Sequence, residues 1–421
     1  MATDVIRLTY LIETPGAPET LAAKIASDQS TGTFVPVPGE TPELKARVAA
    51  RVAALRPLPD AQSPSFPTNH SGPFHRAEAD IDFPLDAIGT DLSALLTIAI
   101  GGAYSIKGFS GIRVVGLQLP QAYQGAHPGP QFGVAGSRRL TGVYGRPIIG
   151  SIVKPALGLH PHETAELVGK LIAADVDFVK DDEKLMSPVY SPLAARVAAI
   201  MPLILEQEQR SGKKVMYAFG ISHADPDVMM RNHDLVLAAG GNCAVININS
   251  IGFGGMAFLR KRSGLVLHAH RNGWDILTRH PGLGMDFAVY QQFWRLLGVD
   301  QFQINGIGVK YWEPDASFVA SFKAVSTPLF DPADCPLPVA GSGQWGGQAP
   351  ETYARTGRTL DLMYLCGGGI VSHPGGPAAG VRAVRQAWEA AVAGVALDSY
   401  AKDHRELAQA IAKFGGGAGD A

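Results

Sequence analysis

The chain has 421 residues, of which 46% are hydrophobic and 18% charged, and its formal net charge at pH 7 is −2. This length and composition predict two domains with a large core, and the near-neutral charge lacks the basic field that nucleic-acid binding requires. No stretch reaches the ~18 consecutive apolar residues of a membrane-spanning helix, and the first residues lack the pattern of a signal peptide.

The three cysteines indicate the kind of cellular compartment in which the protein is expected to lie. Cys243, Cys335 and Cys366 are far apart in the sequence and share no metal-ligand spacing. This usage favours a reducing environment over a disulfide framework. We therefore expect a cytoplasmic protein.

The first 125 residues predict a small α+β domain. Residues 5–13 read as a strand, and Pro18 opens a helix that continues to residue 27. Further strands are expected at residues 31–37, 80–83 and 112–119, with a second helix at 91–100. A loop rich in Gly, Pro and Gln follows at residues 120–133, and we place the domain boundary within it, between residues 125 and 126.

From residue 148 onward, short apolar runs alternate with helix-like segments. The runs are IIGSIV, VDFV, KVMYAF, CAVINI, LVLHA, QFQIN, LPVAG and LMYLC. Eight such units predict a (β/α)8 barrel within residues 126–421, because strands buried on both faces read as continuous apolar runs. QFQIN is the weakest of the eight, and a doubly wound open sheet is the alternative architecture.

Polar residues follow several of these runs, where barrel enzymes carry their active sites. The second run ends in DFVKDDEKL, residues 177–185. Such a charge run is usually a solvated turn, but its position after a barrel strand favours a functional site. Lys154 follows the first run, and His268, His270 and Arg271 lie at the end of the fifth.

The residue types in this run suit a magnesium site. Asp182 and Glu183 offer hard oxygen ligands of the kind that Mg²⁺ prefers. A cation repels Lys180 unless its amine is neutral or modified, and CO₂ converts a neutral amine into an anionic carbamate ligand. The alternative is an ion pair between Lys180 and a neighbouring carboxylate. Near a divalent cation the pKa of Lys154 should fall, which would make it a general base rather than a surface lysine at a turn.

Glycine-rich segments after the seventh and eighth runs predict a phosphate site. Both GSGQWGG, which contains Ser342, and CGGGIVSHPGG let backbone N–H groups approach an anion. Lys310 lies after the sixth run in NGIGVKYWEP, where it could reach toward the site. His268 and His270 point to one side of their strand. Lone histidines are usually core residues, but the adjacent Arg271 favours an anion-binding pair.

These motifs resemble the large subunit of ribulose-bisphosphate carboxylase/oxygenase (RuBisCO). The matching motifs, in this order, are KPALGL from residue 154, DFVKDDE from 177, HAHR from 268 and the triple glycine from 367, with DQSTGTF from 28 similar to that family's substrate-binding loop. The resemblance covers nearly the whole chain. It implies a C-terminal (β/α)8 barrel, a smaller ferredoxin-like α+β domain, and a homodimer whose sites combine one subunit's barrel with the other's N-terminal domain.

The resemblance also implies roles for individual residues. Lys180 would be the carbamylated ligand that completes a Mg²⁺ site with Asp182 and Glu183, and Lys154 would be the proton-abstracting base. The residues expected to contact substrate or its phosphate are His270, Arg271, the mobile-loop Lys310, Thr33, Ser342, Gly343, Gly367 and Gly368.

Three departures separate the chain from carboxylating members of the family. Ala156 replaces a second lysine, Gly102 replaces an asparagine beside the metal, and Gln303 stands where a histidine would help bind a second phosphate. The resemblance is therefore to RuBisCO-like proteins (form IV), whose members include enolases and isomerases of methylthio-sugar phosphates and a transcarboxylase/hydrolase acting on 3-oxo-isoapionate 4-phosphate.

We expect Mg²⁺-dependent enolisation, or related carbon-chain chemistry, on a singly phosphorylated keto-sugar or keto-acid. Three alternatives stay open. They are a Schiff-base aldolase that uses Lys180 or Lys154, a true ribulose-bisphosphate carboxylase, and a non-catalytic sugar-phosphate binder.

Overall fold

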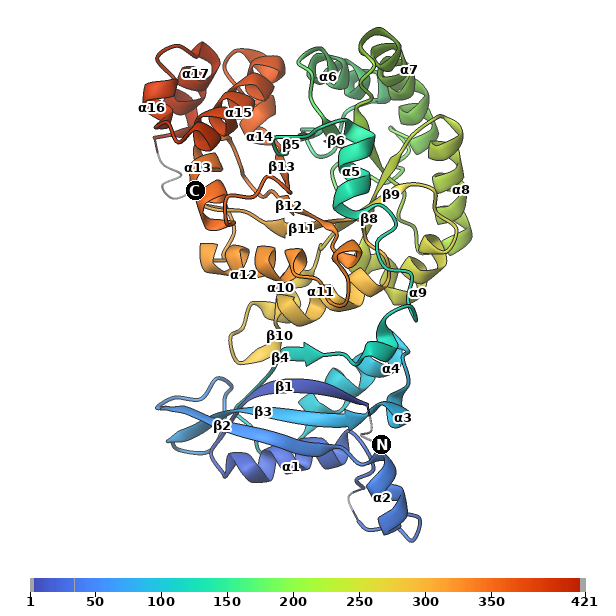
Figure 1. Ribbon diagram of the computed structural model, residues 1–421, viewed down its shortest axis with the longest axis vertical. Helices are drawn as coiled ribbons and strands as arrows, with labels where there is room; N and C mark the ends of the chain where they lie inside the picture. The colour runs from blue at the N-terminus through green and yellow to red at the C-terminus, as the bar shows by residue number, and fades with distance from the viewer. Residues whose placement is uncertain (1–3, 34, 417–421) are drawn as a thin grey trace. The chain divides into compact units, whose positions relative to one another are not determined.

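The computed structural model describes residues 4–33 and 35–416, which form two compact units (Figure 1). The first unit comprises the chain up to residue 127 together with residues 273–293. The second comprises residues 128–272 and the chain from 294 onward. Residues 273–293, which the sequence assigned to the barrel domain, thus belong to the first unit.

The first unit is built on a five-stranded sheet in the order β10-β4-β1-β3-β2. Its strands are β1 (Val5–Thr14), β2 (Arg51–Ala61), β3 (Phe74–Pro84), β4 (Gly111–Gln118) and β10 (Leu283–Met285). β1 through β4 pair antiparallel, whereas β10 adds in parallel beside β4. The helices of this unit are α1 (Pro18–Asp28), α2 (Pro42–Val48), α3 (Leu85–Ile88), α4 (Leu92–Leu96) and α10 (Trp274–Thr278). The order of β1 to β4 and the packing of α1 against the sheet match the ferredoxin-like expectation.

The sequence predicted much of this unit but not all of it. The strands at 5–13, 80–83 and 112–119 and the helix from Pro18 are confirmed. The strand expected at 31–37 is wrong, because residues 31–33 and 35–37 form turns without a partner strand; Phe34 lies outside the described residues. The helix expected at 91–100 begins as α4 and continues as a π-helical turn over Thr97–Gly101.

The second unit contains a closed eight-stranded parallel barrel, as predicted. Its strands are β5 (Ile148–Ile152), β6 (Phe178–Lys180), β7 (Met216–Gly220), β8 (Cys243–Asn247), β9 (Val266–His270), β11 (Gln301–Asn305), β12 (Leu337–Ala340) and β13 (Met363–Cys366). Closure of the barrel excludes the open sheet. QFQIN is a strand despite its two glutamines, and all five of its residues are buried.

One helix, α5, precedes the first barrel strand, and the other helices lie between or after the strands along the chain. They are α5 (Gly133–Thr141), α6 (Pro161–Ala173), α7 (Leu193–Ser211), α8 (Pro226–Ala238), α9 (Ile248–Arg260), α11 (Phe287–Leu296), α12 (Asp315–Ser326), α13 (Ala349–Arg355), α14 (Gly368–Val371), α15 (Gly376–Ala393), α16 (Leu397–Tyr400) and α17 (Arg405–Phe414). α11 runs across the division between the units, since residues up to 293 belong to the first.

Alternate residues of the barrel strands fill the interior. The core includes Phe178 of β6, Met216 of β7 and Val245 of β8. Because side chains alternate along a strand, Lys180 points to the same side as Phe178, but one layer nearer to the carboxyl ends of the strands. Apolar side chains therefore fill the barrel interior as far as the layer of Phe178. Polar side chains such as Lys180 lie in the next layer, at the opening formed by the carboxyl ends of the strands, which we call the barrel mouth.

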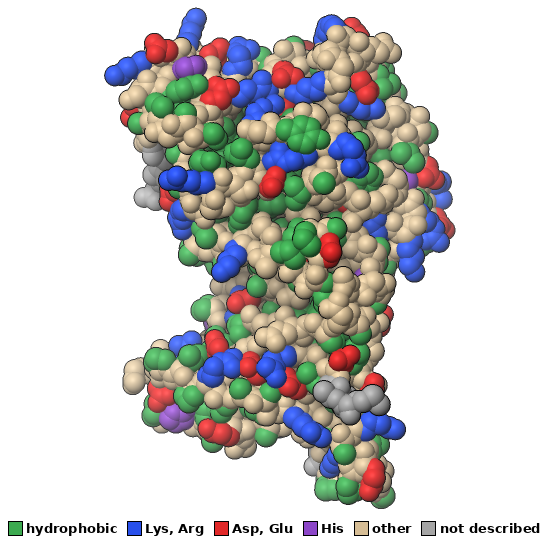
Figure 2. All heavy atoms as spheres, viewed as in Figure 1, with side chains coloured by type: hydrophobic (Ala, Val, Ile, Leu, Met, Phe, Trp, Pro, Cys, Tyr) green, Lys and Arg blue, Asp and Glu red, His purple; other side chains and the backbone are tan. Residues whose placement is uncertain are grey.

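The surface carries mixed charge. On the face shown in Figure 2, basic and acidic side chains are interspersed, in keeping with the net charge of −2. Within residues 4–33 and 35–416, no helix has the length and apolar character needed to cross a bilayer.

Candidate functional site at the barrel mouth

The charged run at the end of β6 is largely buried, and only its last residue, Lys184, is exposed in a turn. Lys180 and Asp181 are fully buried, Asp182 is 1% exposed, and the Glu183 side chain is 23% exposed. The register of β6 against β5 and β7 places Lys180 beside Ile152 and Ala218 in the barrel wall. The structure therefore brings the predicted ligand residues together at the barrel mouth.

The Lys180 amine lies among the carboxylates. Its Nζ donates to the Asp181 carbonyl at 2.9 Å and lies 3.5 Å from Glu183 Oε2. Burial lowers the pKa of Lys180 below its usual value, although the carboxylates of Glu183 and Asp182 act in the opposite direction. The unmodified side chain thus forms the ion pair considered as the alternative, and burial favours the neutral amine that reacts with CO₂.

Asp181 has a structural role instead of a ligand role. Its carboxylate accepts from Arg196 at 3.0 Å, from the Tyr217 hydroxyl at 2.7 Å and from the Gly220 N–H at 3.0 Å. These bonds tie the end of β6 to α7 and β7. The two acids that follow, Asp182 and Glu183, instead face Lys154 and Lys180.

Lys154 is joined directly to this cluster. It follows β5 at a cis peptide bond to Pro155, and its Nζ donates to Asp182 Oδ2 at 2.6 Å. Gly367, after β13, leaves room for this side chain, since a Cβ there would lie 3.2 Å from Lys154 Cε. Strands β5, β6 and β13 together therefore position the predicted base.

The two histidines of β9 differ in role although they share a side of the strand. His268 is fully buried, bonds Gln301 Oε1 through Nδ1 at 2.9 Å and stacks on Phe178. His268 is thus a core residue, as lone histidines in apolar strands usually are, and is not part of an anion-binding pair. His270 lies higher, with Nε2 3.4 Å from Glu183 Oε2, and burial lowers its pKa well below the usual value. A neutral His270 therefore borders the acidic cluster.

Arg271 contacts an acid that the sequence did not single out. Its guanidinium forms an ion pair with Oε2 of Glu313, in the segment between β11 and α12. Glu313 is 5% exposed and also accepts from Asn305 Nδ2 at 2.7 Å and from Ser317 Oγ at 2.6 Å. Sequence reasoning missed Asn305 and Glu313; the positions of both close to β11 were the available signal.

The glycine-rich segments after β12 and β13 pack against each other. Ser342 and Gly343 have positive φ angles of 69° and 90°. A Cβ on Gly343 would lie 3.4 Å from Lys310 Cγ, so the predicted mobile-loop lysine lies beside this turn. Gly367 and Gly368 begin the short helix α14. The two segments meet at Gly369, where a Cβ would lie 2.4 Å from the Gln344 carbonyl oxygen.

Thr33 belongs to the first unit. Its hydroxyl donates to the Val35 carbonyl and lies 3.3 Å from Glu40 Oε1. In the same unit, the Gln29 amide accepts from the Ala103 N–H at 2.9 Å and donates to the Ile98 carbonyl at 3.0 Å, and a Cβ on Gly102 would meet this amide at 2.7 Å. The role of Thr33 stays a prediction.

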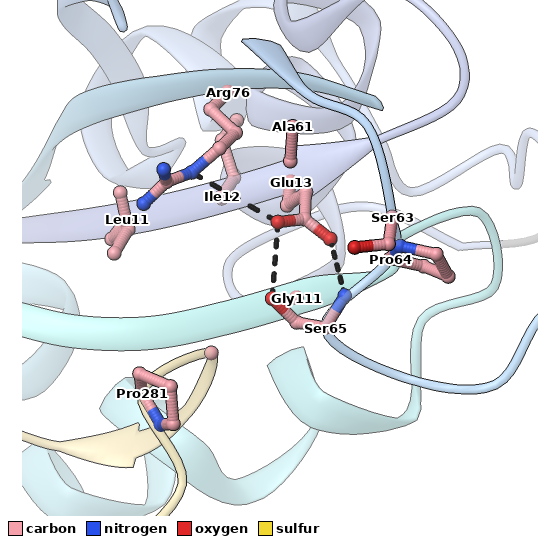
Figure 3. Close-up of a pocket in the computed structure, with 11 residues that line it drawn as sticks. Leu11, Ile12, Glu13, Ala61, Ser63, Pro64, Ser65, Arg76, Gly111 and Pro281 are labelled. Carbon is pink, nitrogen blue, oxygen red and sulfur yellow. Dashed lines mark hydrogen bonds and ion pairs between the residues drawn. The ribbon is translucent and has the colours of Figure 1, made fainter. Parts of the chain in front are cut away.

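The first unit also holds a hollow of about 370 Å³, which lies outside the barrel mouth. Figure 3 shows Glu13 of β1 facing Ser65, with Arg76 of β3 nearby. Glu13 accepts from the Ser65 N–H at 2.7 Å, from Ser65 Oγ at 3.0 Å and from Ser110 Oγ at 2.8 Å. This buried carboxylate fastens the segment after β2 to the sheet, which accounts for it as a structural group.

The comparisons with known proteins identify the family. Residues 133–414 match the family described as "Ribulose bisphosphate carboxylase large chain, catalytic domain". The chain belongs to the RuBisCO large-chain family. The crystal structure of a rubisco-like protein from Burkholderia fungorum has a TM-score of 0.91 and 41% sequence identity, over 98% of this chain and 100% of that one. A dimeric archaeal RuBisCO from Hyperthermus butylicus has a TM-score of 0.84 and 25% identity, over 98% of this chain and 96% of that one.

Two curated relatives match this RuBisCO-family chain over nearly its whole length and carry enzyme names. A 3-oxo-isoapionate-4-phosphate decarboxylase from Rhizobium etli is 79% identical over 99% of this chain and 100% of its own. A 3-oxo-isoapionate-4-phosphate transcarboxylase/hydrolase from Xanthobacter autotrophicus is 45% identical over 96% of this chain and 97% of its own. The expectation of a RuBisCO-like protein is thereby confirmed.

Proposed function

We propose that the chain is a Mg²⁺-dependent decarboxylase of 3-oxo-isoapionate 4-phosphate. The observation that carries the proposal is the 79% identity with a relative of that name along the whole chain. The barrel mouth supports it, because Lys154 pairs with Asp182 there and the neighbouring Glu183 lies beside both Lys180 and His270.

The reaction is the loss of a carboxylate β to a ketone. The bond between C1 and C2 breaks, C1 leaves as CO₂, and the electron pair forms a C2–C3 enolate whose negative charge lies on the ketone oxygen. A proton then adds to C2 and restores the ketone. The enzyme must therefore stabilise charge at one oxygen and supply one proton to one carbon.

The donor set at the end of β6 fits Mg²⁺ when Lys180 carries a carbamate. Within the described residues, no group of three or more His, Cys, Asp and Glu side chains could hold a metal ion. The carbamate of Lys180 would add the missing anionic oxygen to those of Asp182 and Glu183, and oxygen ligands suit Mg²⁺. When bound, Mg²⁺ supplies positive charge that stabilises a developing enolate oxygen.

Lys154 is the residue best placed to move the proton. Its Nζ–H bond to Asp182 Oδ2 at 2.6 Å orients the amine beside the proposed ligands. In this reaction Lys154 Nζ would give its proton to C2 and recover one from solvent. The base expected from the sequence thus becomes the proton donor when the carboxylate leaves.

We further propose that the phosphate binds at the segments after β12 and β13. Exposed backbone N–H groups around glycines suit an anion, and the residues proposed for it are Ser342, Gly343, Gly367 and Gly368, with Lys310 adjacent. Thr33 would complete the site from the N-terminal unit of the partner in a homodimer. The dimeric RuBisCO among the solved structures supports this assembly.

The test is release of CO₂ from substrate labelled with ¹³C in its carboxylate, with Mg²⁺ and unlabelled bicarbonate present. Wild type should release labelled CO₂ and, in D₂O, give a product with one deuteron at C2. Lys154→Met should retain Mg²⁺ binding and release CO₂ about 10²–10⁴ times more slowly. The matched control Lys170→Met removes an exposed ammonium of α6 that pairs with Glu166 and should stay within about threefold of wild type.

Two outcomes would contradict the proposal. Consumption of the substrate without labelled CO₂ would favour the reaction named for the Xanthobacter relative. Tight binding without consumption would instead support the non-catalytic binder.

A further inference from the structure

Near the carboxyl end of strand β11, two amide side chains each have a carbonyl oxygen that accepts no hydrogen bond from the described residues. Gln303 is 7% exposed and Asn305 is 3% exposed. Neither Gln303 Oε1 nor Asn305 Oδ1 has a hydrogen-bond donor within the described part of the chain. The amide of Asn305 is oriented by its own bond, because its Nδ2 donates to Glu313 Oε2 at 2.7 Å. Its carbonyl oxygen is therefore the end left without a donor.

Gln303 is on the inner face of the barrel. Gln303 pairs in register with Val339, a core residue of β12, and Gln301 two residues earlier bonds the buried His268. Because side chains alternate, position 303 shares the inner face with 301, but the register shift after Gln303 breaks the alternation before Asn305. Asn305 lies at the carboxyl end of the strand, and its bond to Glu313, which pairs with Arg271 after β9, places its amide beside the mouth. Gln303 and Asn305 thus face the mouth that holds the proposed site.

The backbone at this point is held in an unusual conformation. Asn305 has a φ of 86°, and the register between β11 and β12 shifts between Gln303 and Asn305. A positive φ at a residue other than glycine is sparsely populated and is concentrated at functional sites. At this irregularity the Asn305 amide bonds Glu313, beside Arg271 at the end of β9.

The positive charge near these amides is already neutralised. The Arg271 guanidinium at the end of β9 forms an ion pair with Glu313 Oε2, the atom that also accepts from Asn305. A phosphate placed beside this pair would meet the Glu313 carboxylate and two amide oxygens, all of which repel it. A donor such as a hydroxyl would instead satisfy acceptors whose burial without partners is unfavourable by about 1–3 kcal/mol each.

We propose that Gln303 and Asn305 form a subsite that recognises the hydroxyl groups at the end of the substrate away from its phosphate. The inference rests on the proposed function and deepens it, because it sets the substrate's orientation. The phosphate binds at the glycine segments after β12 and β13, and the hydroxylated end lies against β11. Glu313 acts as a positioning residue that neutralises Arg271 and fixes the Asn305 amide.

The experiment compares dissociation constants of three probes by calorimetry, with Mg²⁺ and bicarbonate present. Erythrulose 1-phosphate carries a hydroxylated carbon that dihydroxyacetone phosphate lacks, and ribulose 1,5-bisphosphate carries a second phosphate. Wild type should bind erythrulose phosphate at least about tenfold more tightly than either of the others. Equal or tighter binding of the bisphosphate would overturn the proposal.

Variants assign the preference to the two amides. Gln303→Met keeps the length of the side chain without its polar atoms, and Asn305→Gly keeps the positive φ without the amide. Each should lose about tenfold in affinity for erythrulose phosphate and stay within about twofold for dihydroxyacetone phosphate. Gln118→Met, at the exposed end of β4, is the matched control and should behave as wild type. If both variants keep the wild-type preference, the subsite is wrong.

The two proposals fail separately. Absence of CO₂ release together with the predicted order of affinities would reject the decarboxylase and support the subsite. Decarboxylation without any preference for the hydroxylated probe would reject the subsite and leave the reaction in place.

Discussion

The buried His268 makes the stability of the barrel depend on pH. Burial lowers its pKa to about 3, whereas in the unfolded chain a histidine has a pKa near its ordinary value of about 6.5. Between these values the unfolded chain binds more protons than the folded one. The contribution of His268 to stability is therefore constant above pH ~6.5 and is lost progressively as the pH falls toward 3.

We predict that His268→Gln, which keeps a hydrogen-bond donor for Gln301, reduces this acid sensitivity. Between pH 7 and pH 5, the free energy of unfolding of wild type should fall by about 2 kcal/mol more than that of the variant. Urea denaturation at the two pH values measures the difference. His162→Gln changes an exposed histidine of α6 and should follow wild type. Parallel behaviour of wild type and His268→Gln would refute the assignment.

At the residue scale, the sequence indicated the location of the candidate site. It did not indicate which side chains of that site are already occupied by hydrogen bonds and ion pairs within the protein. Lys154, Lys180, Asp182 and Glu183 could be found because each follows an apolar run that reads as a barrel strand. The structural role of Asp181 could not, since its partners Arg196 and Tyr217 lie 15 and 36 positions away. The pairing of Arg271 with Glu313 likewise spans 42 positions.

At the scale of elements, the segments after β12 and β13 depend on close backbone contact. A Cβ on Gly369 would lie 2.4 Å from the Gln344 carbonyl oxygen and 2.7 Å from Trp345 Cβ. The backbone would have to shift to accommodate it. We predict that Gly369→Ala lowers the free energy of unfolding by about 1–3 kcal/mol and weakens binding of dihydroxyacetone phosphate.

The control for this prediction is Gly254→Ala in helix α9, where a Cβ would meet none of the described atoms within 4 Å. Alanine is the better helix former, so this variant should be unchanged or more stable by up to ~1 kcal/mol. Chemical denaturation and calorimetry of all three proteins provide the comparison. If Gly369→Ala and wild type had the same free energy of unfolding, close contact between the segments after β12 and β13 would not contribute to stability, and the prediction would be wrong.

The elements that the sequence missed have physical reasons. β2 is an edge strand with two prolines, Pro57 and Pro59, and most of its residues are partly or fully exposed; edge strands tolerate proline, so the apolar pattern is weak. The run at 31–37 alternates like a strand, yet Val35 and Val37 are 48% and 42% exposed. The buried barrel strands could be predicted because burial on both faces leaves a strong apolar signal.

At the scale of the whole molecule, one chain segment belongs to a different unit from the one expected from its position in the sequence. β10 has only three residues, Leu283–Met285, and pairs with β4 in the first unit although it lies between two barrel strands in sequence. Arg113 of β4 anchors this segment by donating to the carbonyls of His280 at 3.0 Å and Leu283 at 2.8 Å. A long-range strand pairing of this kind has no local pattern, so composition and periodicity could not predict it.

The most direct test of the account is ¹³C NMR of the protein in ¹³C-bicarbonate and Mg²⁺, because the proposed metal site requires a carbamate on Lys180. Wild type and Lys154→Met should each show one carbamate resonance, and Lys180→Met should show none. A wild-type spectrum without that resonance, or a resonance that persists in Lys180→Met, would contradict the central claim.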